Sequence, residues 1–150
     1  MTFDEALELA YQAHQGQVDK AGKPYFEHII RVTNNVSTEQ AKKLAVLHDI
    51  LEDTEVTKEQ LTPLLTEEEL FILQCLTHHP NEPYVDYIER VKLHPVAVEV
   101  KVADLVDNAD LTRIQNPTRR DHDRRQKYLK ALVSLTSYRF ERIRGTNEES

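Results

Sequence analysis

The chain has 150 residues, of which 39% are hydrophobic and 30% charged, and its formal net charge is −7. This length suits one domain with a real core, and the composition is that of a soluble globular protein. The acidic balance argues against a general nucleic-acid binder, which needs a basic face. No apolar run approaches the about 20 residues that span a bilayer, and the N-terminus lacks the basic start of a signal peptide. The single cysteine, Cys75, fits a reducing cytoplasm, so we expect a cytoplasmic protein without membrane or nucleic-acid partners.

Scarce glycine and abundant Leu, Glu, Ala and Lys favour a mostly helical protein. Capping-box pairs, which mark helix starts, occur at Thr2–Glu5, Ser37–Gln40, Thr57–Gln60 and Thr66–Glu69. Together with apolar periodicity, they predict helices at about 3–14, 24–36, 38–51, 58–65, 67–77, 84–93, 95–114 and 117–144. Gly145 is expected to end the last helix, which leaves 146–150 as a disordered tail. The prediction is a single compact all-α domain over residues 1–145.

One stretch carries conflicting signals. Val96, Val98, Val100 and Val102 alternate with other residues as in a strand, but no partner strand is visible elsewhere in the chain. The spacing then returns to three or four residues towards Ile114. We therefore interpret the stretch as a buried helix.

The segment from Leu47 to Thr54 places His48, Asp49, Glu52 and Asp53 among aliphatic residues. Burying so many ionisable groups is unfavourable unless something pairs with them, and a divalent cation accepts imidazole and carboxylate together. In a helix, His48 and Glu52 lie one turn apart, as do Asp49 and Asp53. Two adjacent residues would then hold a metal while the two residues a turn later reach past it towards a substrate.

Two further residues are chemically out of place. His28 follows an aromatic pair on an otherwise apolar helix, and Asp104 lies among valine, alanine and leucine. Two imidazoles and two carboxylates from three helices would form a mixed nitrogen and oxygen site that suits Mn²⁺, Fe²⁺, Zn²⁺ or Mg²⁺. The alternative is that His28 and His48 are core histidines hydrogen-bonded to Asp104 and Asp49. Taken together, the four residues favour the metal site.

Four motifs occur in a characteristic order: Gly16-Gln17 with Lys20, the run 24–28 (PYFEH), the run 45–54 (AVLHDILEDT) and the run 100–104 (VKVAD). As an ordered set over roughly the first 115 residues, they resemble the HD-domain phosphohydrolase superfamily. Within it, the chain is most similar to the RelA/SpoT-type hydrolase domain and the stand-alone small alarmone hydrolases.

The resemblance implies an HD-domain helical bundle with one divalent metal, usually Mn²⁺. It implies that the metal is held by His28, His48, Asp49 and Asp104, and that Glu52-Asp53 is the catalytic acidic pair. The implied reaction is hydrolysis of a nucleotide phosphoester, as in the (p)ppGpp 3′-pyrophosphohydrolases. The wider superfamily leaves two alternatives open: another nucleotidase or phosphodiesterase, or a non-catalytic nucleotide sensor with a retained metal site.

The resemblance also implies that Lys20 faces phosphate and that Tyr25 and Asn108 line the nucleotide pocket. The family usually has basic residues at two places where this chain has Val18-Asp19 and Leu105. The basic run Arg119–Arg125, interleaved with acidic residues, is either a solvated helical face or a border of the pocket that supplies attraction for anions. The oligomeric state is left open.

Overall fold

The structure, a computed structural model, describes the backbone of residues 1–149 and the side chains of residues 1–142 and 144. Within this part of the chain, the secondary structure consists of helices and one isolated antiparallel bridge between Val18 and Pro24. The helices are α1 (Phe3–Ala13), α2 (Phe26–Asn34), α3 (Glu39–Leu47), α4 (Ile50–Asp53), α5 (Lys58–Leu61), α6 (Glu67–Cys75), α7 (Tyr84–Val91), α8 (Pro95–Ala109) and α9 (Arg119–Glu149). The all-α prediction is confirmed.

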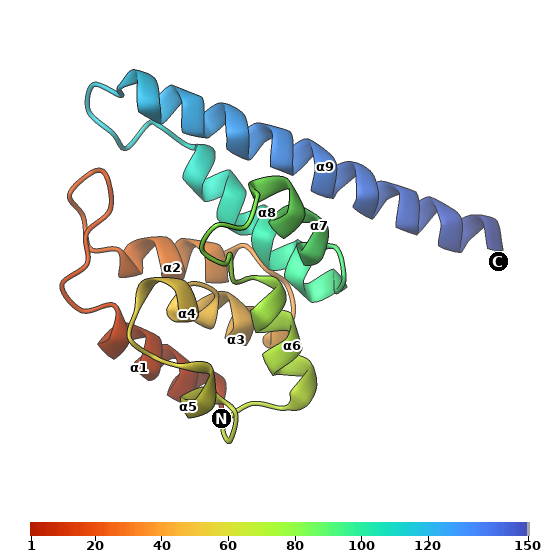
Figure 1. The fold of residues 1–150 in the computed structure, drawn as a ribbon, viewed down its shortest axis with the longest axis horizontal. Helices are drawn as coiled ribbons and strands as arrows, with labels where there is room; N and C mark the ends of the chain where they lie inside the picture. Colours follow the sequence, from red (N-terminus) through yellow and green to blue (C-terminus); the bar gives the residue numbers. More distant parts are fainter. Residues whose placement is uncertain (150) are drawn as a thin grey trace.

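Helix α3 lies at the centre of the fold and packs against α1, α2, α6 and α8 (Figure 1). Every residue from Leu44 to Ile50 is buried, because the end of α3 and the segment after it are surrounded by other helices. Helix α8 runs between this core and α9, which crosses the outer side of α8 and extends beyond the rest of the molecule (Figure 1). No helix in the described chain is long and apolar enough to cross a membrane.

Local side-chain chemistry explains most of the helix starts. The predicted capping boxes of Thr2, Thr57 and Thr66 are present, and each threonine accepts a hydrogen bond from the backbone three residues later. The box predicted at Ser37 is wrong. Thr38 caps α3 by accepting from the N–H of Ala41 at 3.0 Å, while Ser37 hydrogen-bonds Glu99 of α8.

The structure corrects three helix boundaries. The predicted helix 38–51 is divided, because His48 and Asp49 lie between α3 and α4. Helix α8 ends at Ala109 rather than near residue 114, since Asp110 has an extended backbone. Helix α9 continues through Gly145 to Glu149, so the predicted stop at Gly145 is wrong, and the last residue of the predicted tail, residue 150, lies outside the described chain. The stretch with alternating valines is helical, as expected.

Candidate metal centre and active site

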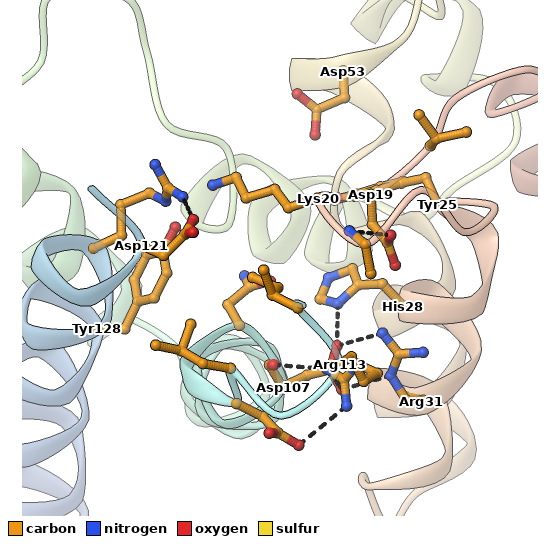
Figure 2. Close-up of a pocket in the computed structure, with 17 residues that line it drawn as sticks. Asp19, Lys20, Tyr25, His28, Arg31, Asp53, Asp107, Arg113, Asp121 and Tyr128 are labelled. Carbon is orange, nitrogen blue, oxygen red and sulfur yellow. Dashed lines mark hydrogen bonds and ion pairs between the residues drawn. The ribbon is translucent and has the colours of Figure 1, made fainter. Parts of the chain in front are cut away.

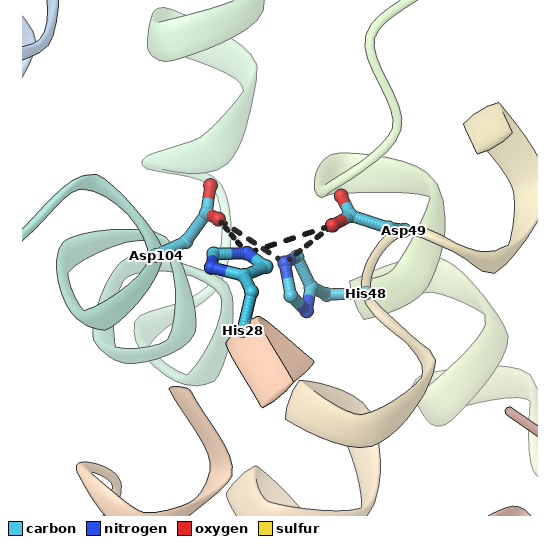
Figure 3. Close-up of side chains that lie close together, drawn as sticks. All are labelled: His28, His48, Asp49 and Asp104. Carbon is cyan, nitrogen blue, oxygen red and sulfur yellow. Dashed lines mark hydrogen bonds and ion pairs between the residues drawn. The ribbon is translucent and has the colours of Figure 1, made fainter. Parts of the chain in front are cut away.

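Two histidines and two aspartates from three parts of the fold meet at one point (Figure 3). His28 comes from α2, His48 and Asp49 from the link between α3 and α4, and Asp104 from α8. One potential ligand atom from each residue lies within 4.8 Å of all the others. The Nε2 atom of His48 is 3.0 Å from Asp49 Oδ2 and 3.2 Å from Asp104 Oδ1. The structure thus brings together all four residues that were predicted as metal ligands.

The arrangement around His28 tests whether a cation fits. Its Nε2 atom is buried and makes no hydrogen bond within the described part of the chain, although Asp104 Oδ1 lies 3.0 Å away. A buried nitrogen left unpaired is unfavourable, and here it faces two carboxylates. Simple core pairing accounts for the hydrogen bond between His48 and Asp104, but it leaves His28 Nε2 without a partner. Two nitrogen and two oxygen donors that converge in this way suit a divalent metal ion.

The electrostatics of the four residues also match a cation site. Burial opposes the charged form of His28, but the neighbouring carboxylates of Asp104 and Asp107 outweigh it and raise its pKa to about 9. In the same way, burial lowers the pKa of His48, but Asp49 and Asp104 outweigh burial and raise it above its ordinary value. Burial also opposes the charged form of Asp104, but Lys101 and the two histidines hold its pKa well below the ordinary value. The carboxylates therefore draw positive charge to this point, which a divalent metal would supply.

Further hydrogen bonds orient His48, Asp49 and Asp104. The backbone oxygen of Ala45 lies 2.6 Å from His48 Nδ1, and Lys101 Nζ donates to Asp104 Oδ2 at 2.8 Å. The Tyr25 hydroxyl donates to Asp49 Oδ2, and Asn108 donates to Asp104 Oδ1 at 3.1 Å. Such outer partners orient ligands and tune their basicity.

Glu52 and Asp53 lie in α4, immediately after the ligand pair His48-Asp49. Carboxylate oxygens of both come within 4.8 Å of each other and of Asp49. Partial burial raises the pKa of Glu52 to about 7; the hydrogen bond from the N–H of His78 opposes this shift, and the charge of Asp49 adds to it. Burial and the charge of Asp49 also raise the pKa of Asp53. A carboxyl group with a pKa near neutrality beside a metal centre is suited to proton transfer.

A cavity of about 570 Å³ opens beside the metal centre (Figure 2). This volume is in the range of small-molecule sites. Five residues singled out from the sequence line it, namely Lys20, Tyr25, His28, Asp53 and Asn108. The side chain of Lys20 extends across the space in Figure 2. Partial burial and the nearby Arg124 lower its pKa, so Lys20 lies in an environment that favours an anionic partner.

Helix α9 supplies a wall of the cavity through Arg124 and Tyr128 (Figure 2). The sequence left open whether the basic run borders the pocket, and the structure places Arg124 of that run there. Arg124 forms an ion pair with Asp121, and Arg125 donates to the backbone of Ala109 at 3.1 Å. The sequence did not single out Tyr128 as a pocket residue. Its position at the cavity follows from how α9 crosses α8, which no local pattern predicts.

The two departures from the family pattern have different environments. Leu105 is fully buried in the hydrophobic core, so it does not face the cavity. Asp19 lies on the cavity wall, but its Oδ1 accepts hydrogen bonds from the backbone of Ala21 at 2.9 Å and Lys23 at 3.0 Å. Asp19 therefore shapes the loop that carries Lys20.

The helical fold and the two-histidine, two-aspartate centre are those that the HD-domain resemblance implies. No family model matches the chain. The chain is 39% identical over 77 residues to guanosine-3′,5′-bis(diphosphate) 3′-pyrophosphohydrolase of Borreliella burgdorferi, a match that covers 49% of this chain and 12% of that protein. It is 26% identical over 161 residues to the pyrophosphohydrolase MESH1 of Drosophila melanogaster, covering 97% of this chain and 86% of that one.

A solved structure described as a metazoan ortholog of SpoT that hydrolyzes ppGpp has a similar fold, with a TM-score of 0.74. The two chains are 23% identical, and the match covers 89% of this chain and 84% of the other. The chain is thus similar to ppGpp 3′-pyrophosphohydrolases in sequence and fold, which confirms the resemblance indicated by its motifs.

Proposed function

We propose that residues 1–145 form a metal-dependent phosphohydrolase domain that removes pyrophosphate from the ribose 3′ position of a guanosine nucleotide of the (p)ppGpp type. The main support is the convergence of His28, His48, Asp49 and Asp104 beside the carboxyl pair Glu52-Asp53 and a nucleotide-sized cavity. The names of the similar proteins favour this substrate. The reaction would take place in the cytoplasm, on a small nucleotide rather than a nucleic acid.

His28, His48, Asp49 and Asp104 would hold the metal, for which we propose Mn²⁺. When bound, such an ion lowers the pKa of its water and neutralises the phosphate that it contacts. Glu52 positions the attacking water and accepts its proton, a role that matches a pKa near 7. Asp53 faces the cavity and holds the geometry of the reacting groups. The water oxygen bonds to phosphorus, the bond between phosphorus and the 3′ oxygen breaks, the 3′ oxygen takes up a proton, and pyrophosphate is released.

The remaining cavity residues bind the nucleotide. Lys20 lines the cavity and forms no ion pair within the described part of the chain. Its ammonium group is therefore free to bind a phosphate. Tyr25 and Asn108 reach both the cavity and the ligands Asp49 and Asp104. They would therefore couple the position of the substrate to the position of the metal ligands.

The test is a product-resolved screen of nucleotides, including ppGpp and pppGpp, with the Mn²⁺-loaded protein. We expect pyrophosphate release that is lost on treatment with a chelator. Glu52→Gln should reduce the rate about 10²- to 10⁴-fold while metal binding persists. Glu55→Gln, the same change at an exposed residue beyond the end of α4, should retain activity.

The other products distinguish the alternatives. Orthophosphate or a cleaved diester would indicate another nucleotidase or phosphodiesterase of the wider superfamily. Nucleotide binding that Glu52→Gln leaves unchanged, with no product under any metal, would indicate a sensor. Either result would contradict the pyrophosphohydrolase proposal.

A further inference from the structure

Beneath the metal centre, Asp107 is the acceptor for a cluster of three side chains (Figure 2). Its Oδ2 lies 2.6 Å from His28 Nδ1. Arg31 donates from Nε to Oδ1 at 2.7 Å and from Nη2 to Oδ2 at 3.1 Å, and Arg113 donates from Nη2 to Oδ1 at 3.2 Å. The Asp107 side chain is 10% exposed, so these contacts are largely shielded from water.

This geometry determines which nitrogen of His28 is free. The two arginines keep Asp107 an ionised, acceptor-only carboxylate, so the short contact requires a proton on His28 Nδ1. The lone pair of the neutral ring is then on Nε2, which points at Asp49 and Asp104 and makes no hydrogen bond. A histidine that binds a metal through one nitrogen commonly donates the other N–H to a carboxylate in this way.

The position of Asp107 in α8 adds to the argument. Asp107 lies three residues after the ligand Asp104, so both project from neighbouring positions on the same helix. One rigid element thereby supplies a ligand and orients a second ligand that belongs to α2. His48 differs in this respect, because among the described residues its Nδ1 meets the backbone oxygen of Ala45 rather than a side chain.

We propose that Asp107, clamped by Arg31 and Arg113, is a positioning residue that fixes the ring of His28 for metal binding. The proposal rests on the metal site of the proposed function but not on its substrate. The competing explanation is that the cluster merely ties α2 to α8. A tie of that kind would change the stability of the fold and leave the metal affinity of the folded protein unchanged.

The decisive variant is Asp107→Asn. The introduced asparagine has the shape of the aspartate but only one acceptor oxygen, which cannot serve both arginines and His28. Asp110→Asn is the matched control, because Asp110 also pairs with Arg113, at 3.1 Å. The other hydrogen bonds that the Asp110 side chain accepts within the described chain come from Thr112, and its contacts there do not extend to His28.

The measurement is Mn²⁺ affinity of the full chain by titration calorimetry, with circular dichroism to check the fold. Wild-type protein must first bind Mn²⁺; if it does not, the metal site of the proposed function fails. We expect Asp107→Asn to weaken binding about 10- to 100-fold, and Asp110→Asn by less than about threefold. Hydrolysis is not measured, so absence of turnover on ppGpp would leave this proposal standing.

Wild-type affinity in folded Asp107→Asn, or an equal loss in Asp110→Asn, would overturn the proposal. If Asp107→Asn does not fold, Arg31→Gln takes its place. This variant keeps Asp107 and His28 and removes the two hydrogen bonds from Arg31. A loss of Mn²⁺ affinity of more than about threefold would support the clamp, and unchanged affinity would overturn it.

Discussion

Lys101 is the side chain whose replacement probes the charge balance of the centre most directly. Its Nζ lies 2.8 Å from Asp104 Oδ2, and the two side chains are 11% and 4% exposed. Burial opposes the charge on Lys101, but Asp104 and Tyr87 outweigh it and raise its pKa well above the ordinary value. Lys101→Met keeps most of the side-chain volume and removes the positive charge.

The expected loss of stability follows from the partners that remain. Removing one member of a buried ion pair commonly costs about 3–5 kcal/mol because the other charge is left without compensation. Asp104 keeps three other partners: His28 Nε2 at 3.0 Å, His48 Nε2 at 3.2 Å and the hydrogen bond from Asn108. We therefore expect a smaller destabilisation, about 2–3 kcal/mol in the metal-free protein. For a chain of this size, that lowers the Tm by about 5–10 °C.

The assay is thermal unfolding in the presence of a chelator and again in excess Mn²⁺. A bound cation compensates Asp104, so the difference between variant and wild type should shrink when Mn²⁺ is present. Lys58→Met, at an exposed position, serves as a control and should change stability by less than about 0.5 kcal/mol. An unchanged Tm in chelator, or a larger deficit in Mn²⁺ than in chelator, would refute the reasoning.

Three further predictions concern substrate binding, proton transfer and the loss of stability at acidic pH. Lys20→Ala should raise the KM for a phosphorylated nucleotide about tenfold and change kcat much less, in steady-state kinetics; an unchanged KM would remove Lys20 from the phosphate site. The activity should rise from about pH 5 and level off, because Glu52, with a pKa of about 7, must be ionised to accept a proton. A bound cation nearby lowers the pH at which half of the maximal rate is reached. A rate that falls over this range would contradict the role of Glu52. Glu69→Gln should cost about 1 kcal/mol in chemical unfolding at neutral pH, because it removes the 2.7 Å pair with Lys43. Burial raises the pKa of Glu69, but Lys43 and Thr66 outweigh burial and lower it. The contribution of Glu69 to stability is therefore complete above the ordinary pKa of 4.5 and is lost as the pH falls through the lower pKa of the folded protein. A deficit in the variant that persists in acid would show another cause.

The cluster of two histidines and two aspartates could be predicted from the sequence because the chemistry of these residues conflicts with their surroundings. His28 and Asp104 occur among apolar residues that belong to the core, where an ionisable group requires a partner. Helix starts were predictable for a similar reason, since a threonine and a glutamate or glutamine three residues apart satisfy each other's backbone without outside help. Both signals are complete within a short stretch of sequence.

The break between α3 and α4 shows where such local signals end. Residues 44–50 are buried without interruption, so the hydrophobic pattern alone predicts one continuous helix. The helix ends at Leu47, and Asp49 has φ −101° and ψ 1°, outside the helical range. His48 Nδ1 lies 2.6 Å from the oxygen of Ala45, and Asp49 meets Tyr25 from a distant part of the chain. The contact with Tyr25 forms only when the start of α2 is in place. The sequence of the segment itself therefore does not predict the break.

The outer contacts of the centre depend even more strongly on the assembled fold. Asp104, Asp107 and Asp110 follow one another at intervals of three residues in or just after α8, so their spacing alone does not distinguish them. The crossing of α2 over α8 brings His28 and Arg31 to the first two and leaves Asp110 at the surface, 39% exposed. Residues with the same chemistry and spacing therefore have different surroundings: Asp104 is a proposed metal ligand, Asp107 lies behind the proposed ligand His28, and Asp110 is a surface partner of Arg113. Exchanging Asp107 and Asp110 for asparagine in turn separates these surroundings experimentally, because the two substitutions are chemically identical and both residues pair with Arg113, but of the two only Asp107 contacts His28.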